Sequence, residues 1–150
     1  MKKLFLLFGI MLAFAFTSSA SAGSVSVYAN PHNEGKHTNG AGISASMDVT
    51  KNVDVSVNYL DTNARRDAGG KKFFDARVGL SAPIAGNLSA LAEAGYGTVQ
   101  HGDDEVIPFA RGLKYTMMAE KLFLGGKGTR YFKDTDEQRV QWTVGVGLNF

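Results

Sequence analysis

Residues 139–150, RVQWTVGVGLNF, end the chain with an alternation of side chains that never breaks. One set is apolar: Val140, Trp142, Val144, Val146, Leu148 and Phe150. The other set is polar or small: Gln141, Thr143, Gly145, Gly147 and Asn149. A period of two is that of an extended strand with one apolar and one polar face. This stretch therefore predicts a β-strand that ends the chain.

The same alternation recurs along the rest of the chain. Seven earlier strands are expected over residues 23–30, 39–49, 53–61, 73–82, 88–97, 106–117 and 121–132. The connections after the first, third, fifth and seventh strands are long and charged, and the other three are short. Short alternating strands with turns of this kind predict an all-β protein, an eight-stranded antiparallel up-and-down barrel.

The first 22 residues have the pattern of a cleavable signal peptide. Lys2 and Lys3 precede an apolar run, and Ala20-Ser21-Ala22 supplies the small residues that a signal peptidase accepts. The run is shorter than the roughly 20 residues that a membrane-spanning helix needs. We therefore expect residues 1–22 to be removed and residues 23–150 to form one barrel domain.

Composition excludes several classes of function. Of the 16 basic residues two lie in the leader, so the mature chain carries 14 basic and 14 acidic residues. This balance gives no support to nucleic-acid binding. The chain has no Cys, which excludes disulfides, thiolate metal sites and a cysteine nucleophile. No mature segment is long enough for a membrane-spanning helix, so insertion into a bilayer would have to use strands.

The end of the chain also resembles the C-terminal assembly signal of bacterial outer-membrane barrels. The matching residues are Thr143, Gly145, Leu148 and Phe150. The pattern of strands is similar to that of small outer-membrane barrels of the OmpA-transmembrane, OmpX and Ail type. This resemblance implies a transmembrane barrel in the outer membrane, with both termini periplasmic and with the barrel-assembly machinery as a partner during biogenesis.

The composition of the polar face favours a membrane barrel over a soluble periplasmic barrel or sandwich. That face is mostly Ser, Gly, Asn and Asp, whereas a soluble barrel would show long Lys and Glu side chains to water. An eight-stranded barrel has room inside only for side chains that fill it, so small residues are expected there. Aromatic residues of the apolar face fall near the strand ends, as in membrane girdles: Tyr59, Phe74, Tyr96, Phe109, Trp142, Tyr115 and Phe150.

Charges on the polar face predict an ion-pair network in the lumen, because a buried charge is costly unless it is paired. The expected members are Arg77, Glu93, Asp75 and Lys114, with Asp48, Asp54 and Lys127 nearby. A symmetric turn over residues 83–87 would place Arg77 directly opposite Glu93, with Asp75 as a second acceptor. The network is interpreted as a structural plug, and the alternative is a narrow ion path.

Arg111 interrupts the apolar face of its strand. Strict alternation from Phe109 to Leu113 would direct it into lipid, at a cost of about 2 to 4 kcal/mol. We therefore expect a bulge or register change near Ala110 that turns the guanidinium inward or toward a rim.

A second basic group lies in an expected external loop and comprises Arg65, Arg66, Lys71 and Lys72. These residues either solubilise the loop or contact phosphates of lipopolysaccharide or an acidic host or phage surface, because Arg forms bidentate bonds to phosphate.

The histidines give little support to catalysis. His37-Thr38-Asn39 is similar to the His-x-Ser-Asn element of lipid A deacylase barrels, but Thr stands in place of the nucleophilic Ser. No set of Ser, His and acid is evident elsewhere. His32, His37 and Glu34 lack a recognisable metal-ligand spacing. We expect no catalytic residues, no metal and no cofactor.

Together these patterns favour a monomeric outer-membrane protein with a structural or surface-interaction role, in contact with lipopolysaccharide or with a host or phage surface. A narrow ion or small-solute channel is the first alternative. A lipid-modifying enzyme is the second.

Overall fold

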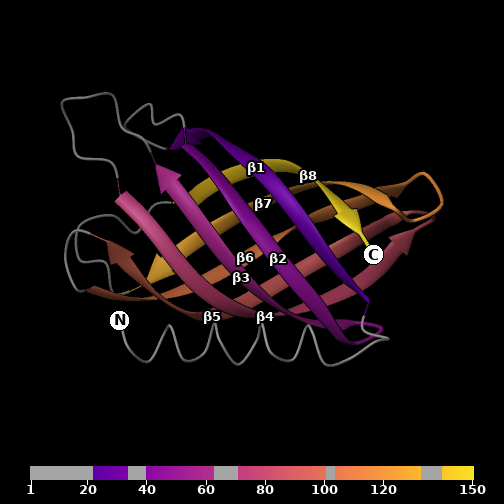
Figure 1. The fold of residues 1–150 in the computed structure, drawn as a ribbon, viewed down its shortest axis with the longest axis horizontal. Helices are drawn as coiled ribbons and strands as arrows, with labels where there is room; N and C mark the ends of the chain where they lie inside the picture. Colours follow the sequence, from indigo (N-terminus) through magenta and orange to yellow (C-terminus); the bar gives the residue numbers. More distant parts are fainter. Residues whose placement is uncertain (1–21, 34–39, 63–70, 101–103, 133–139) are drawn as a thin grey trace.

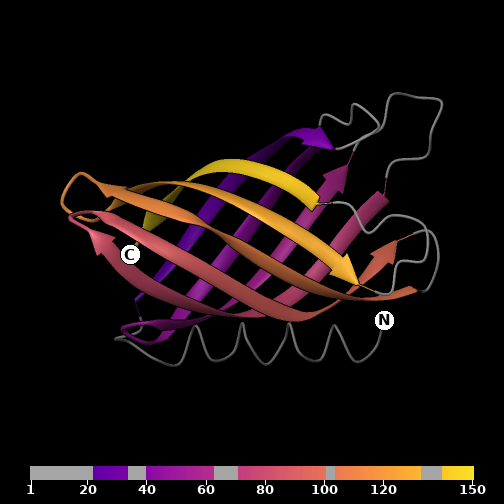
Figure 2. The same ribbon diagram turned by 180° about the vertical axis from the view of Figure 1, so that it is seen from behind.

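Eight antiparallel strands form one closed barrel. The structure, a computed structural model, describes residues 22–33, 40–62, 71–100, 104–132 and 140–150. Each strand pairs with its neighbours in sequence, and the last pairs with the first, so that the predicted fold is confirmed. Figures 1 and 2 show the strands wrapped obliquely about the long axis. They are β1 (Gly23–Asn33), β2 (Gly40–Thr50), β3 (Val53–Thr62), β4 (Lys71–Ala85), β5 (Leu88–Gln100), β6 (Asp104–Met117), β7 (Leu122–Phe132) and β8 (Val140–Asn149).

The two ends of the barrel differ. At one end, here named the turn end, short connections join β2 to β3, β4 to β5 and β6 to β7. The C-terminus lies at this end (Figure 1), where Gly23 and Phe150 exchange backbone hydrogen bonds of 3.0 and 2.9 Å. The opposite end is named the loop end. The expected signal peptide lies outside the described residues, apart from Ala22. Within the described ranges, no helix has the length and apolar character needed to cross a membrane.

The outer surface of the barrel is apolar and the inner surface is polar. Large exposed side chains include Val27, Ile43, Leu80, Leu113, Val144 and Leu148. Buried polar side chains include Ser56, Asn58, Asp75, Arg77, Thr129 and Thr143. A soluble barrel would have the opposite arrangement, because its apolar face would form the core. The faces are those predicted from the alternation.

The interior changes in character along the barrel axis. Toward the loop end it is filled by large side chains, here named the apolar plug: Leu60, Phe73, Val99, Val106 and Tyr131. Within the plug the rings of Phe73 and Tyr131 are stacked, with centroids 4.3 Å apart. Toward the turn end the interior holds a partly open cavity of about 210 Å³, lined by many serines and threonines together with Glu93, Lys114 and Phe123. The prediction that small side chains line the interior therefore applies only to the half near the turns.

The predicted register of β4 against β5 is wrong by two residues. Arg77 pairs with Gly95, and Glu93 pairs with Gly79, so the two charged residues are not directly opposite. The turn is not the symmetric one expected, because Gly86 adopts a φ of +52° in a tight turn and the register shifts between Pro83 and Ala85. A shift by an even number of residues keeps every side chain on its expected face.

The predicted bulge near Ala110 is also wrong. Phe109, Arg111 and Leu113 pair in unbroken sequence with Ala94, Ala92 and Ala90 of β5. The strand is regular there, and the side chain of Arg111 is exposed on the outer wall of the barrel. The regular pairing of β6 is therefore kept through Arg111, even though it directs a cation to the outer wall.

Candidate functional site

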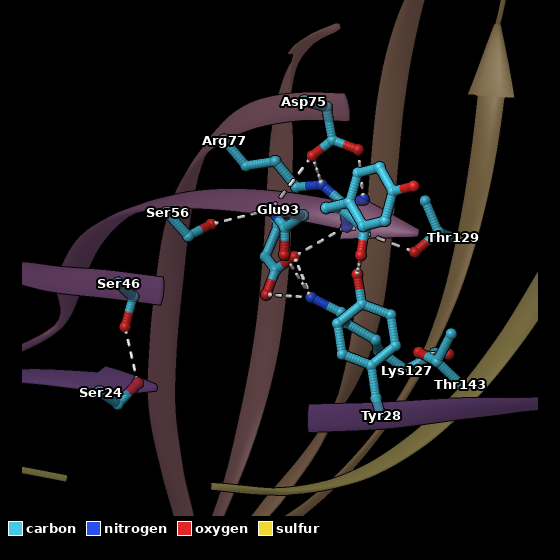
Figure 3. A network of polar contacts seen from close by, with 12 residues as sticks. Ser24, Tyr28, Ser46, Ser56, Asp75, Arg77, Glu93, Lys127, Thr129 and Thr143 are labelled. Carbon is cyan, nitrogen blue, oxygen red and sulfur yellow. Dashed lines mark hydrogen bonds and ion pairs between the residues drawn. The ribbon is translucent and has the colours of Figure 1, made fainter. Parts of the chain in front are cut away.

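A network of charged side chains crosses the lumen between the apolar plug and the cavity. Asp75 and Arg77 come from β4, Glu93 comes from β5, and Lys127 comes from β7 (Figure 3). Asp75 and Arg77 are two residues apart on one strand, and so they face the same side. The alternation of β7 brings Lys127 to meet them across the lumen.

Arg77 is the centre of this network. Its Nε and Nη2 donate to the two carboxylate oxygens of Asp75 at 2.6 and 2.9 Å, which makes a bidentate pair. Nη1 donates to Oε2 of Glu93 at 3.0 Å. The hydroxyls of Thr129 and Tyr131 lie 3.3 and 3.2 Å from the same guanidinium. Arg77 is only 3% exposed, and these partners replace its hydration.

Glu93 joins Arg77 to a second cation. Lys127 Nζ lies 3.0 and 3.3 Å from the two oxygens of Glu93, and 3.5 Å from Oδ1 of Asn58. Asn58 in turn donates to Asp75 at 3.0 Å. The four charged groups of the network balance to zero net charge. Such a network can fill and close the lumen without leaving a buried charge unpaired.

The structure brings together three of the four residues expected in the network, namely Arg77, Glu93 and Asp75. Lys114 lies apart, toward the turn end. Its Nζ bonds to Oδ1 of Asn149 at 3.1 Å and lies 4.2 Å from the centre of the Phe123 ring.

Several residues of the network were not expected from the sequence: Tyr28, Asn58, Thr129 and Tyr131. Lys127, Thr129 and Tyr131 alternate on one face of β7. That alternation was the available signal, but three glycines in the same strand obscured the facing.

The residues of the expected assembly signal lie on both faces of β8. Phe150, which follows this strand, and Leu148 are exposed on the outer wall, and Phe150 is 73% exposed. Thr143 faces inward and donates to the Lys127 carbonyl at 3.2 Å. Gly145 also faces inward, where an added Cβ would lie 2.6 Å from Cβ of Tyr28.

Only part of the basic group lies within the residues that the structure describes. Arg65 and Arg66 lie outside the described residues, and for Lys71 only the backbone pairing with Thr62 is described. Lys72 Nζ lies 3.8 Å from Asp61, and both side chains are more than a third exposed.

The histidine-based alternatives fall largely outside the described residues, which exclude Glu34, His37, Thr38, Asn39 and His101. The backbone of His32 pairs with Trp142 in the barrel wall. In the described part of the chain, no group of three or more His, Cys, Asp or Glu residues could hold a metal ion.

Comparison with known proteins adds evidence on the fold. No protein-family model matches the chain, and no curated protein matches its sequence significantly. Among solved structures, the N-terminal β-barrel domain of Pseudomonas aeruginosa OprF superposes with a TM-score of 0.69 at 15% identity, covering 87% of this chain and 100% of that domain. The outer-membrane protein Ail of Yersinia pestis gives 0.62 at 15% identity, covering 87% and 100%. Neisserial surface protein A gives 0.53 at 11% identity, covering 86% and 93%. The chain therefore has the fold of the small eight-stranded outer-membrane β-barrels.

Proposed function

We propose that this protein is a closed barrel of the outer membrane that acts through its exterior, in a structural or surface-interaction role, and not by passing solutes. The observation that carries the proposal is the blocked lumen. The network of Arg77, Asp75, Glu93 and Lys127 spans it at mid-height, and the apolar plug fills it toward the loop end. A narrow path for ions would need both barriers to open together.

The apolar exterior supports the membrane location. A wall of exposed Val, Ile and Leu is unfavourable in water and favourable in hydrocarbon. Strands that close into a barrel also leave no sheet edge with unpaired backbone groups in the bilayer. The fold shared with OprF, Ail and Neisserial surface protein A supports the outer membrane in particular. We infer that the turn end is periplasmic and that both termini lie there, because short turns face the periplasm in such barrels.

Lipopolysaccharide is the partner that we propose for the loop end, with a host or phage surface as the alternative. Arg65, Arg66, Lys71 and Lys72 would supply the cations. Lys72 has a carboxylate nearby, and so it contributes less to the proposed contact than the arginines. The C-terminal residues would engage the assembly machinery during biogenesis, and the barrel would function as a monomer without enzymatic activity.

Conductance in planar bilayers tests the closed lumen. The refolded protein should give no sustained current above the lipid background. The variant Phe73→Ala/Arg77→Ser/Glu93→Ser/Tyr131→Ala removes the stacked rings of the plug and the central ion pair of the network. It should conduct, which shows that the assay can detect an open barrel. Stable single-channel currents from the unsubstituted protein, equal to those of this variant, would contradict the proposal and favour the channel.

A separate measurement tests surface interaction and enzymatic activity. Refolded protein in vesicles should bind lipopolysaccharide, and replacement of Arg65 and Arg66 by Gln should weaken this binding. Mass spectrometry of lipid A from cells with and without the protein should give the same species. An altered acylation pattern would instead favour a lipid-modifying enzyme.

A further inference from the structure

Two arginines on the outer wall lie next to each other. Arg111 of β6 and Arg130 of β7 are both exposed and both point outward. The other outward charges in the described strands are Asp61, Lys72 and Glu105. Each of these lies closer to the loop end than the aromatic residue of its own strand, Tyr59, Phe74 or Phe109. Among the described strands, Arg111 and Arg130 are therefore the outward charges that lie level with these aromatic residues, here named the girdle, or nearer the turn end.

Pairing within the sheet sets the depth of both residues. Arg130 lies between Phe109 of β6 and Val140 of β8, at the level of the girdle. Arg111 lies two residues nearer the turn end, opposite Gly128. A long arginine side chain at this depth can extend along the wall toward the polar interface, which lowers the cost of placing its charge near hydrocarbon.

The wall between these strands is hollowed. Gly126 and Gly128 face outward from β7, and their strand neighbours are Leu113 and Arg111 on one side and Val144 and Trp142 on the other. A Cβ added to Gly128 would lie 3.2 Å from the Trp142 ring, so the ring leans over this glycine. An added Cβ at Gly126 would meet no heavy atom closer than 3.8 Å. Gly128 is buried beneath Trp142 and Val140, whose Cγ1 lies 3.0 Å from the Cβ added to Gly128. The wall between these strands is therefore hollowed over Gly126, where a shallow groove with a backbone floor lies beside Arg111.

Arg111 lacks a counter-charge within the described chain. It forms no ion pair or hydrogen bond with any residue that the structure describes. The Arg130 guanidinium lies 5.4 Å from the centre of the Phe132 ring, which holds it against the wall at girdle level. In a bilayer the anions at this depth are lipid phosphates, which accept bidentate bonds from guanidinium groups. A carboxylate from a partner protein is a less favourable counter-charge for Arg111, because placing a carboxylate at this depth of the membrane is itself costly.

We propose that Arg111 and Arg130 form a site on the barrel wall for the phosphate of a membrane lipid, with an acyl chain lying in the groove at Gly126. This inference rests on the proposed membrane location. It differs from the loop contact proposed above, because these residues lie on the wall and the ligand is held from the side.

The single tryptophan of the chain reports on this site, since Trp142 borders the groove. The refolded protein would be placed in phosphatidylcholine bilayers that contain a small fraction of phosphatidic acid with brominated acyl chains, which quench tryptophan fluorescence. Quenching should correspond to a local enrichment of about fivefold over brominated phosphatidylcholine at equal fraction. Arg111→Gln and Arg130→Gln should each lower the enrichment, and the double variant should abolish it.

Lys121→Gln is the matched control, because Lys121 is an exposed cation in the turn between β6 and β7, at the other end of the same two strands. The enrichment of this variant should equal that of the unsubstituted protein. Each variant would first be checked for the heat-modifiable electrophoretic migration of a folded barrel. Equal quenching by the two brominated lipids, or enrichment that survives the double substitution, would overturn the inference. Binding of inorganic phosphate without any enrichment of phosphatidic acid would also overturn it, since the ligand would then be a free ion.

A second copy of the barrel covering the groove is the remaining occupant. In that case both lipids would quench weakly, and quenching would rise when the protein is diluted in the bilayer, an outcome that also refutes the lipid site. The result is independent of conductance. A barrel that conducts but enriches phosphatidic acid would refute only the closed lumen, and a silent barrel without enrichment would refute only the lipid site.

Discussion

Glu93 is the residue on which the lumen network depends most, because it neutralises two cations at once. Arg77 has a second carboxylate, Asp75, but Lys127 has no carboxylate other than Glu93 within ion-pairing distance among the described residues. Substitution of Glu93 would therefore leave Lys127 charged and poorly paired inside the barrel. Substitution of Glu93 and Lys127 together would keep the network neutral.

We predict that Glu93→Gln lowers the free energy of unfolding by about 3 kcal/mol, the usual cost of breaking a buried pair. The double variant Glu93→Gln/Lys127→Met should lose less than the sum of the single losses, with a coupling of about 1 to 3 kcal/mol. Urea unfolding in lipid vesicles measures both quantities. The exposed pair of Lys72 and Asp61, 3.8 Å apart, is the control and should show coupling below about 1 kcal/mol. Simple additivity of the Glu93 and Lys127 losses would show that the network is not coupled.

At the scale of the element, β8 closes the barrel. It pairs with β7 on one side and with β1 on the other, and Phe150 bonds to Gly23 through two backbone contacts. Its aromatic ring is not part of the packed interior, since it is 73% exposed. The side chain therefore contributes little to packing inside the barrel, and an assembly defect after its substitution would reflect recognition.

We predict that Phe150→Ser reduces the amount of folded protein in outer-membrane fractions and leaves export across the inner membrane intact. Heat-modifiable migration on gels measures the folded fraction, and signal-peptide processing measures export. Phe132→Ser is the matched control, because Phe132 is also an exposed aromatic at a strand end but lies at the loop end. Equal loss of folded protein in the two variants would attribute the effect to general hydrophobicity.

The elements also show how far the sequence could predict this structure. Alternation located all eight strands and the faces of seven of them, because a period of two needs no knowledge of partners. In β7 the consecutive apolar residues Leu122, Phe123 and Leu124 and the glycines left the facing open. It could not give the register of β4 against β5, which depends on the left-handed conformation of Gly86 and the shift after Pro83. It brought Arg77 and Glu93 to one face, but their contact is diagonal across the strand pair. Tyr131 and Phe73 were missed in the lumen because neither is small or charged.

For the whole molecule, the outer wall is an apolar band interrupted at Arg111. We expect the free-energy cost of this charge to depend on the lipid around the barrel. In zwitterionic bilayers we predict that Arg111→Leu raises the free energy of unfolding by about 2 kcal/mol, because a cation near hydrocarbon is removed. The gain should shrink in bilayers that contain phosphatidic acid, since the unsubstituted protein then recovers a phosphate contact. Lys72→Leu, nearer the loop end, should change stability by less than about 1 kcal/mol in either lipid. An equal gain from Arg111→Leu in both bilayers would mean that the wall has no preference for lipid phosphate.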